Sequence, residues 1–235
     1  MTADIEQGVR YDARHAAAYD RKIRALIPGY EALHELSAFL LVELLPARAS
    51  VLVAGSGTGE ELTRYADLAP DWRLTGLEPS GEMNARAAER CLVAGVAERV
   101  RLVEGKPGET ELGERFDAAT ALLVLHFLPD DGAKAAFLAA LAHALEPGGW
   151  LLLADWAGER GEPMCERLFR AWRSQQDATR PKPEQVALDF AHLDRNVHPV
   201  SPERRIALLA EAGFTVEGEY WRAYGLSALL ARKTA

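Results

Sequence analysis

Apolar residues follow two different spacings along the chain, and the change between them divides it into regions. Over residues 30–45 they recur every three or four positions, as on one face of a helix. Pro28 and Gly29 precede this segment and indicate a turn. From residue 51 onward, short apolar runs alternate with amphipathic segments. This pattern therefore predicts helices in the first 45 residues and repeated strand–helix units from residue 51 onward.

Five apolar runs are the predicted parallel strands of one sheet. They lie at 50–55, 72–78, 99–105, 116–128 and 150–156, with helices at 60–69, 80–95 and 132–145 between them. Near-continuous apolar strands are typical of parallel sheets that helices cover on both faces. A further helix at 202–214 leads to two adjacent strands joined by a tight turn at Gly225. We therefore predict an α/β, Rossmann-like fold: a seven-stranded, mostly parallel sheet with an antiparallel C-terminal hairpin strand and a helical cap.

The segment 158–200 breaks the alternation of strands and helices. It is polar with scattered aromatic residues, yet Leu168, Phe169 and Trp172 share one helical face. A flexible linker has no need of such a face, so we predict a helical insertion that forms part of the cap.

Composition and charge narrow the class of protein. The chain has 235 residues, 49% of them hydrophobic, which is enough for one sizeable α/β domain with an inserted cap. Its formal net charge of −8 does not provide the broad basic surface that binding to a phosphate backbone requires, so a nucleic-acid partner is not favoured. Cys91 and Cys165 are far apart and fit no metal-ligand spacing, so we expect two buried cysteines and no metal site.

The sequence shows no targeting or membrane-spanning pattern. Its first residues, MTADIEQGVRYD, are charged and contain no apolar core of a signal peptide. No apolar run approaches the roughly 18–20 residues that a membrane span needs. We therefore expect a cytoplasmic protein without a membrane partner.

A glycine-rich turn, AGSGTGEE, follows the first strand and contains Gly55, Gly57 and Gly59. Glycine tolerates positive φ and lets a ligand approach the main chain, although such a turn can also serve packing alone. The dinucleotide fingerprint needs a third glycine where Glu60 stands, and the phosphate-binding P-loop needs a G-K-[ST] sequence that is not present here. Glu60 and Glu61 would repel a pyrophosphate. A ligand with a cationic amino group and no phosphate fits better, and S-adenosylmethionine has this charge pattern.

Glu78 ends the second strand and supports the same interpretation. An acid at this distance from the glycine turn accepts hydrogen bonds from the two hydroxyl groups of a ribose. The alternative is a solvated loop glutamate. Together with the glycine turn, Glu78 predicts a nucleoside site without a phosphate.

These segments resemble the class I S-adenosylmethionine-dependent methyltransferases. The similar segments are VLVAGSGTGEE, LTGLEPSGEMNARA, RVRLVEGKPGE, FDAATALLVLHFLPDD, LEPGGWLLLADW and EAGF, and together they cover about residues 45–157 and 202–233. The resemblance implies S-adenosyl-L-methionine as the cofactor and methyl transfer to a small-molecule acceptor. It also implies an N-terminal helical cap at 1–45, a cofactor-binding methyltransferase domain at 46–157 and 201–235, and a helical insertion at 158–200 in the acceptor cap.

The resemblance also implies which residues lie at the cofactor. These are Tyr30, Gly55, Ser56, Gly57, Gly59, Glu78, Pro79, Met83, Gly105, Lys106 and Leu122. Two positions depart from the family pattern. Val53 stands where the family has an acid that orients the methionine amino group, and Lys106 stands where it has an aspartate that reaches the adenine amino group. Glu60, Glu61 and Glu104 are the candidates to compensate.

Within the superfamily, YDRKIRALIPGYEALHEL and YGLSALLARK are similar to the carboxy-S-adenosylmethionine synthase branch, which is linked to tRNA modification. This similarity implies that Tyr30 lies over the cofactor. The branch also uses an arginine for the extra carboxylate, at the position of Ala191 here, and Arg180 and Arg195 are the available substitutes. A third hypothesis is a methyltransferase fold that serves as a non-catalytic binding protein.

Candidate chemistry lies where the sites of this family open, at the carboxyl ends of the strands. His126 follows the fourth strand and Asp155 ends the fifth, and either can be a general base or a packed structural group. Aromatic residues from the insertion and the last strands can form an acceptor pocket or ordinary core: Trp156, Phe169, Trp172, Trp221 and Tyr224. Tyr11 and Tyr19 can cover the cofactor or pack within helices. The acceptor and the oligomeric state stay open, and a homodimer is compatible with the sequence.

Overall fold

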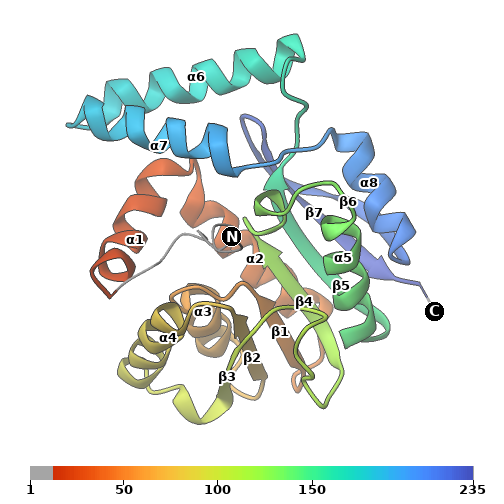
Figure 1. Ribbon diagram of the computed structural model, residues 1–235. Helices are drawn as coiled ribbons and strands as arrows, with labels where there is room; N and C mark the ends of the chain where they lie inside the picture. The colour runs from red at the N-terminus through yellow and green to blue at the C-terminus, as the bar shows by residue number, and fades with distance from the viewer. Residues whose placement is uncertain (1–12, 235) are drawn as a thin grey trace, which may run out of the picture.

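The computed structural model describes residues 13–234, with side chains from Asp20 to Thr234. Its seven strands form one sheet in the order β3-β2-β1-β4-β5-β7-β6 (Figure 1). They are β1 (Ser50–Ala54), β2 (Arg73–Glu78), β3 (Val100–Glu104), β4 (Phe116–Leu122), β5 (Leu145–Trp156), β6 (Phe214–Ala223) and β7 (Leu226–Lys233). The first five are parallel, and β7 is antiparallel to both β5 and β6. The predicted fold class is confirmed.

Helices cover both faces of the sheet. They are α1 (Ala13–Leu26), α2 (Tyr30–Leu44), α3 (Glu60–Leu68), α4 (Gly81–Val93), α5 (Ala133–Ala144), α6 (Pro163–Thr179), α7 (Pro183–Asn196) and α8 (Pro202–Glu211), with two short 3₁₀ helices at Ala97–Arg99 and Leu125–Phe127. Side chains alternate along each strand, so Val51 and Val53 pack into one core and Leu52 and Ala54 into the other. The first core contains residues of α2, α3, α6 and α7, and the second contains residues of α5 and α8.

The predicted break at Pro28 and Gly29 separates α1 from α2. Gly29 has a φ of 72°, and a Cβ there would lie 3.3 Å from Nε1 of Trp221. Glycine at this position therefore satisfies both the left-handed backbone and the close approach of β6. Tyr11 lies outside the described residues, as does the side chain of Tyr19.

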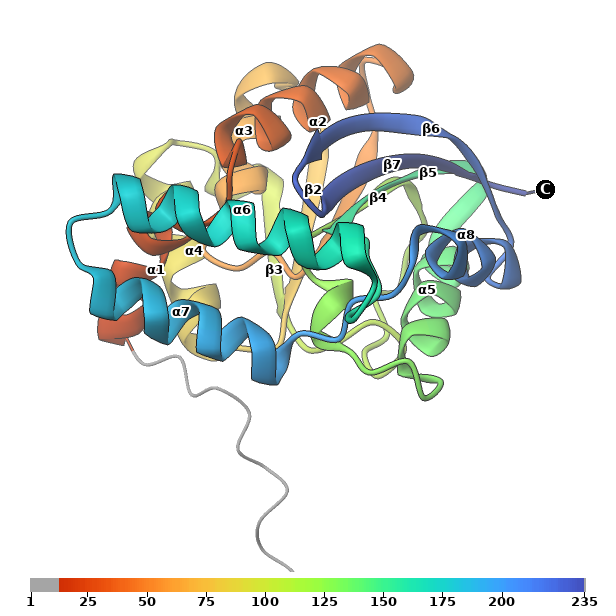
Figure 2. The same ribbon diagram turned by 90° about the horizontal axis from the view of Figure 1, so that it is seen from above.

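The insertion is helical, as predicted, and consists of α6 and α7, which lie side by side across one end of the sheet in both views (Figures 1 and 2). We call Trp156, Phe169, Trp172 and Phe190 the aromatic cluster. Their ring centroids lie 5.1–6.1 Å apart. Nε1 of Trp172 donates a hydrogen bond to the Leu26 carbonyl oxygen at 2.8 Å. These rings pack on one another, so their role here is that of core between β5, α1 and the insertion.

The prediction for the fourth strand was wrong at its end. β4 stops at Leu122 rather than residue 128, because Leu123 has a φ of 63° and the chain then forms the 3₁₀ helix at Leu125–Phe127. The N–H of Leu123 donates to the Ala154 carbonyl oxygen at 2.7 Å, which holds the turn against β5. Apolar composition alone cannot distinguish such a buried turn from strand, since both exclude water.

The structure also bears on membrane spans. No single helix within residues 13–234 is long and apolar enough to cross a membrane. Taken together, the segments Asp20–Leu26 and Tyr30–Leu44 have the length and apolar composition of a membrane span, but they are bent by 97° relative to each other.

Candidate functional site

The three glycines after β1 have different roles. We call residues 55–59 the glycine loop. A Cβ on Gly55 would lie 2.5 Å from Cγ2 of Val124, and one on Gly59 would lie 3.1 Å from the backbone of Ala87. Only at Gly57 does an added Cβ meet no atom nearer than 4.0 Å. A side chain at position 55 or 59 would thus meet the protein's own packing, whereas one at position 57 would enter open space.

Glu78 connects the glycine loop to the turn after β2. Its Oε2 accepts a hydrogen bond from the N–H of Gly57 at 3.0 Å, and its Oε1 accepts one from the N–H of Ser80 at 3.1 Å. Burial raises the pKa of Glu78, although these backbone hydrogen bonds oppose the rise. A carboxylate offers about four acceptor positions, so two remain for hydroxyl groups of a ligand. Glu78 is therefore a half-buried, hydrogen-bonded side chain and not a solvated loop glutamate.

The other predicted cofactor residues differ in exposure. Ser56, Met83 and Leu122 are buried, Gly105 is half-buried, and Pro79 and Lys106 are exposed. Oγ of Ser56 is buried and has no hydrogen-bond partner among the described residues. At Gly105, which has a φ of 152°, a Cβ would lie 2.0 Å from Oγ1 of Thr110, so the turn itself requires glycine.

The ends of β4 and β5 bring His126 and Asp155 together. Oδ1 of Asp155 accepts a hydrogen bond from the backbone N–H of His126 at 3.0 Å and also contacts ring atom Nδ1. Both residues are buried. A carboxylate at Nδ1 favours the proton on that nitrogen and leaves the lone pair of Nε2 available. The pair is therefore arranged to accept a proton at Nε2.

Lys134 supports this turn and was not among the predicted residues. It is fully buried in α5, and its Nζ donates to the Leu125 carbonyl oxygen at 2.7 Å. Burial lowers the pKa of Lys134, and the charges of Asp155 and Asp130 oppose this decrease. The sequence did contain a signal, since Lys134 is the one charged residue in the segment GAKAAFLAALAHAL. A lone lysine in an apolar helix needs a specific partner.

Glu60 and Glu61, which begin α3, lie in opposite surroundings. Glu60 forms ion pairs with Arg24, Arg64 and Arg90 at 2.5, 2.6 and 2.7 Å. Burial opposes ionisation of Glu60, but the hydrogen bond from Arg64 and the charges of the three arginines prevail and lower its pKa. Glu61 instead points into the core, and burial raises its pKa to about 7.

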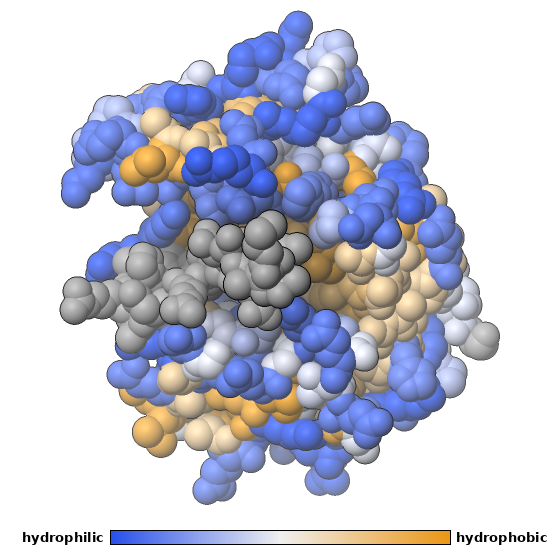
Figure 3. Space-filling model, in the orientation of Figure 1, coloured by the Kyte–Doolittle hydropathy of each residue, from blue (hydrophilic) through white to orange (hydrophobic). Residues whose placement is uncertain are grey.

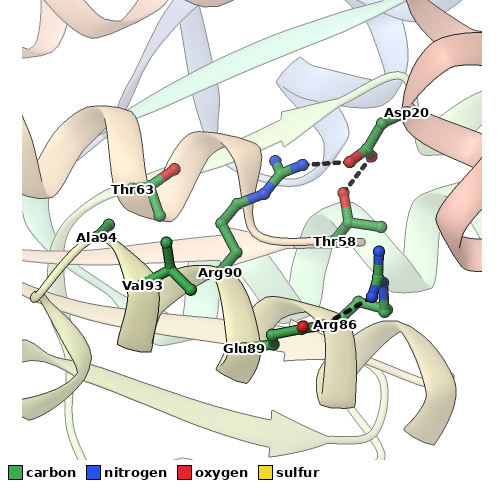
Figure 4. A pocket seen from close by; sticks show the side chains of 8 residues that line it. All are labelled: Asp20, Thr58, Thr63, Arg86, Glu89, Arg90, Val93 and Ala94. Atoms are coloured by element: carbon green, nitrogen blue, oxygen red, sulfur yellow. Dashed lines mark hydrogen bonds and ion pairs between the residues drawn. The ribbon is translucent and has the colours of Figure 1, made fainter.

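The charge network of Glu60 continues into a pocket between α1, α3 and α4 (Figure 4). There Arg90 and the hydroxyl group of Thr58 both point to Asp20; Oγ1 of Thr58 lies 2.5 Å from Oδ1, and Arg90 forms an ion pair with the same carboxylate. These contacts attach α1 to the outer side of the glycine loop. Because Asp20 and Arg90 neutralise each other, we assign this pocket a structural role.

Tyr30 is the first residue of α2 and packs against His34, with ring centroids 4.3 Å apart. Burial, together with the charges of Glu60 and Glu61, raises the pKa of Tyr30 above its ordinary value. Burial lowers the pKa of His34 to about 4. Both side chains are therefore neutral near pH 7. Figure 3 shows that hydrophilic residues predominate on this face of the molecule and that hydrophobic residues gather in smaller patches.

Comparison with known proteins identifies the domain that carries this site. The family model described as "Methyltransferase domain" matches residues 52–151. Residues 52–151 are therefore similar to a methyltransferase domain. The matched residues include the glycine loop, Glu78 and His126.

Two curated relatives match this chain over different lengths. An uncharacterized protein of Synechococcus sp. is 39% identical over 119 residues, which cover 47% of this chain and 26% of that protein. A carboxy-S-adenosyl-L-methionine synthase of Campylobacter concisus is 23% identical over 210 residues, which cover 89% of this chain and 88% of the synthase. The chain thus spans about a quarter of the first protein and most of the second.

Solved methyltransferases share the fold. The mitomycin 7-O-methyltransferase MmcR superposes with a TM-score of 0.68 at 22% identity, over 95% of this chain and 58% of that one. NcsB1, an O-methyltransferase from neocarzinostatin biosynthesis solved with S-adenosylmethionine and 2-hydroxy-5-methyl naphthoic acid, has a TM-score of 0.63 at 19% identity, over 95% and 58%. This chain spans less than two thirds of the length of either enzyme.

Three features of the glycine loop and its surroundings fit S-adenosylmethionine, the ligand of the structural neighbour NcsB1. The loop is open at Gly57, a buried Ser56 hydroxyl group has no partner among the described residues, and Glu78 retains acceptor capacity for a ribose. The exposed Lys106 contributes no acid at the predicted adenine position.

The two arginines considered for an extra carboxylate are placed differently. Arg180 pairs at 2.8 Å with the buried Asp189, whose carboxylate also pairs with Lys22 at 2.8 Å. Arg195 lies on the exposed surface of α7. Arg180 therefore joins the end of α6 to α7, while Lys22 attaches the same carboxylate to α1, and this engagement disfavours a role of Arg180 in binding a carboxylated cofactor.

Proposed function

We propose that this protein transfers the methyl group of S-adenosylmethionine to a hydroxyl group of a small molecule. The His126–Asp155 pair carries the proposal, because the turn that holds it lies against the glycine loop. Val124, two residues before His126, occupies the space that Gly55 leaves. A proton acceptor beside a nucleoside site is what methylation of a hydroxyl group requires.

Each part of the site has one task in this reaction. S-adenosylmethionine supplies an electrophilic methyl group when bound. Gly57, Ser56 and Glu78 bind the nucleoside, and the turn after β4 aligns the acceptor. His126 takes the proton of the hydroxyl group at Nε2 as the new oxygen–carbon bond forms and the carbon–sulfur bond of the donor breaks, with S-adenosylhomocysteine as the leaving group. Asp155 stabilises the resulting imidazolium.

The proposed acceptor pocket lies under the cap, which we assign to residues 1–45 and 158–200. The end of β5 supports this assignment, because Asp155 is followed directly by Trp156 of the aromatic cluster. NcsB1, which shares the fold, is a complex with a small hydroxylated aromatic acid. An aromatic acceptor with a hydroxyl group is therefore the first class to screen.

The test is methyl transfer from labelled S-adenosylmethionine to a panel of phenols, hydroxy acids and amines. His126→Ala should lower the rate by about 10²–10⁴-fold, the usual contribution of a general base, without changing the dissociation constant of S-adenosylhomocysteine. His143→Ala is the matched control, since His143 is an exposed histidine at the end of α5. An unchanged rate in His126→Ala would refute the role of the base. Cofactor binding without transfer to any acceptor would favour the non-catalytic alternative.

A second candidate function is synthesis of carboxy-S-adenosylmethionine. The match to a synthase over 89% of this chain and 88% of that enzyme favours it, whereas the engagement of Arg180 by Asp189 does not. Mass spectrometry of the ligand that copurifies with the protein separates the two: the methyl-donor proposal expects S-adenosylmethionine or S-adenosylhomocysteine, and the synthase expects a species heavier by one carboxyl group.

A further inference from the structure

Glu61 is a buried carboxylate that the proposed reaction leaves unused. It is the second residue of α3 and only 5% exposed. Its Oε1 accepts hydrogen bonds from the hydroxyl groups of Thr120, at 2.6 Å, and Tyr65, at 3.1 Å. Among the described side chains, Oε2 receives no hydrogen bond. The carboxylate is thus held in a fixed position with one oxygen available.

Glu61 also has no cationic partner within residues 20–234. The three arginines nearest the start of α3, namely Arg24, Arg64 and Arg90, all pair with its neighbour Glu60. An ionised carboxylate in a buried position is costly unless a positive charge compensates it. Burial accordingly raises the pKa of Glu61 to about 7, although the hydrogen bonds from Thr120 and Tyr65 oppose the rise. The ionised Glu61 carboxylate thus lacks one positive charge to compensate it among residues 20–234.

The position of Glu61 points to what supplies that charge. Thr120 is the register partner of Val53, so the Glu61 carboxylate lies over β1 and β4 where the glycine loop leaves the sheet. The other two acids considered from the sequence are unsuitable. Glu60 is neutralised by arginines, and Glu104 is exposed at the end of the edge strand β3.

We propose that Glu61 binds the α-ammonium group of S-adenosylmethionine. It thereby takes the role of the family's acid at the position of Val53, whose apolar side chain cannot bind this group. The inference rests on the proposed use of this cofactor. In this arrangement α3, rather than β1, provides the acid, and the bound ammonium group is the missing counter-ion. Thr120 and Tyr65 orient the carboxylate and are positioning residues.

The test compares two ligands that share the nucleoside but differ in the amino acid part. S-adenosylhomocysteine carries the ammonium group, whereas 5′-methylthioadenosine has only the nucleoside and a thioether. By isothermal titration calorimetry, Glu61→Gln should weaken S-adenosylhomocysteine about 10-fold or more, as expected for a charge-assisted contact, and leave 5′-methylthioadenosine within about two-fold. Glu78→Gln is the matched control and should weaken both ligands, because both contain the ribose.

The outcomes separate this inference from the proposed function. If Glu61→Gln binds S-adenosylhomocysteine as tightly as the native protein, or weakens both ligands equally, the inference fails while cofactor binding stands. If the native protein binds neither ligand, the proposed function fails and the inference fails with it. Retained binding of 5′-methylthioadenosine shows at the same time that Glu61→Gln is folded.

Discussion

The two ends of the candidate site are built differently. At the donor end, Glu78 holds the glycine loop through hydrogen bonds from the backbone N–H groups of Gly57 and Ser80, which lie 21 and 2 positions from it. The acceptor end, formed by His126 and Asp155, continues through Trp156 into the aromatic cluster, where the bond from Trp172 to Leu26 spans 146 positions of the chain. Substitutions at the donor end should therefore affect binding first, and those at the acceptor end should affect stability first.

The strongest test of this contrast is Trp172→Ala. Trp172 is 2% exposed, packs against three other rings and donates to Leu26, so its loss leaves a cavity and an unpaired carbonyl group. We expect the free energy of unfolding to fall by about 3–5 kcal/mol in urea titrations, with the cofactor dissociation constant of the folded fraction unchanged. Arg173→Ala, at an exposed position of the same helix, is the control and should change little. A loss below about 1 kcal/mol for Trp172→Ala would contradict the assignment of these rings to the core.

A comparison of Gly55→Ala with Gly57→Ala tests the donor end. Both glycines have positive φ, which costs alanine about 1–2 kcal/mol, but only at position 55 does the new Cβ collide with Val124. That collision should add about 1–3 kcal/mol to the destabilisation. Gly57→Ala should keep more stability and yet lose more cofactor affinity, because its Cβ enters the open space of the loop.

The double variant Gly55→Ala/Val124→Ala sharpens this prediction. Removal of the Cγ atoms of Val124 relieves the contact at 2.5 Å but not the backbone strain. In thermal unfolding, the double variant should therefore lose less stability than the sum of the two single substitutions. If the two effects add, the collision with Val124 is not the cause of the destabilisation by Gly55→Ala.

The same contrast explains what could be predicted from the sequence. The strands and the glycine loop follow from local patterns, namely apolar runs of strand length and glycines between a strand and a helix. The turn at Leu123 could not be predicted, because its apolar residues continue the pattern of β4 and only the hydrogen bond to Ala154 fixes its conformation.

Long-range packing also decides the roles of single residues in the site. Position 55 requires glycine because Val124, which is distant in sequence, occupies the space that a side chain would need, and no local pattern indicates this contact. Glu60 and Glu61 are identical and adjacent, yet one meets three arginines and the other meets two hydroxyl groups. The direction in which each side chain leaves α3 decides this, and it depends on helices α1 and α4 that the local sequence does not specify.

Lys134→Met tests the turn that carries His126, with a smaller expected effect. Methionine keeps the volume of the lysine but leaves the Leu125 carbonyl oxygen without its donor. We expect a loss of about 1–3 kcal/mol in unfolding free energy and a lower rate of methyl transfer at an unchanged cofactor dissociation constant. Lys182→Met, at an exposed position outside the predicted cofactor residues, is the control. Weaker cofactor binding in Lys134→Met would place the lysine at the donor end instead.

The effect expected from Glu61→Gln differs from the others because it depends on pH. The titratable groups that face Glu61 are Glu60 and Tyr65 on α3, Tyr30 on α2 and Tyr220 on β6. Between pH 5 and 8 the tyrosines stay neutral, because burial raises the pKa of each, and Glu60 stays ionised. A difference between the native protein and Glu61→Gln in this range therefore reports Glu61 itself.

The sign follows from the raised pKa of Glu61, which is about 7 in the folded protein against 4.5 ordinarily. The neutral form favours folding fully below pH 4.5, and this contribution is lost as the pH rises through 7. Relative to Glu61→Gln, which does not titrate, the native protein should thus be less stable at pH 8 than at pH 5 in urea titrations. Saturating S-adenosylhomocysteine should reduce this difference, since its ammonium group favours the ionised carboxylate. A pH-independent difference would show that Glu61 stays in one protonation state, and one that the ligand leaves unchanged would show that the ammonium group binds elsewhere.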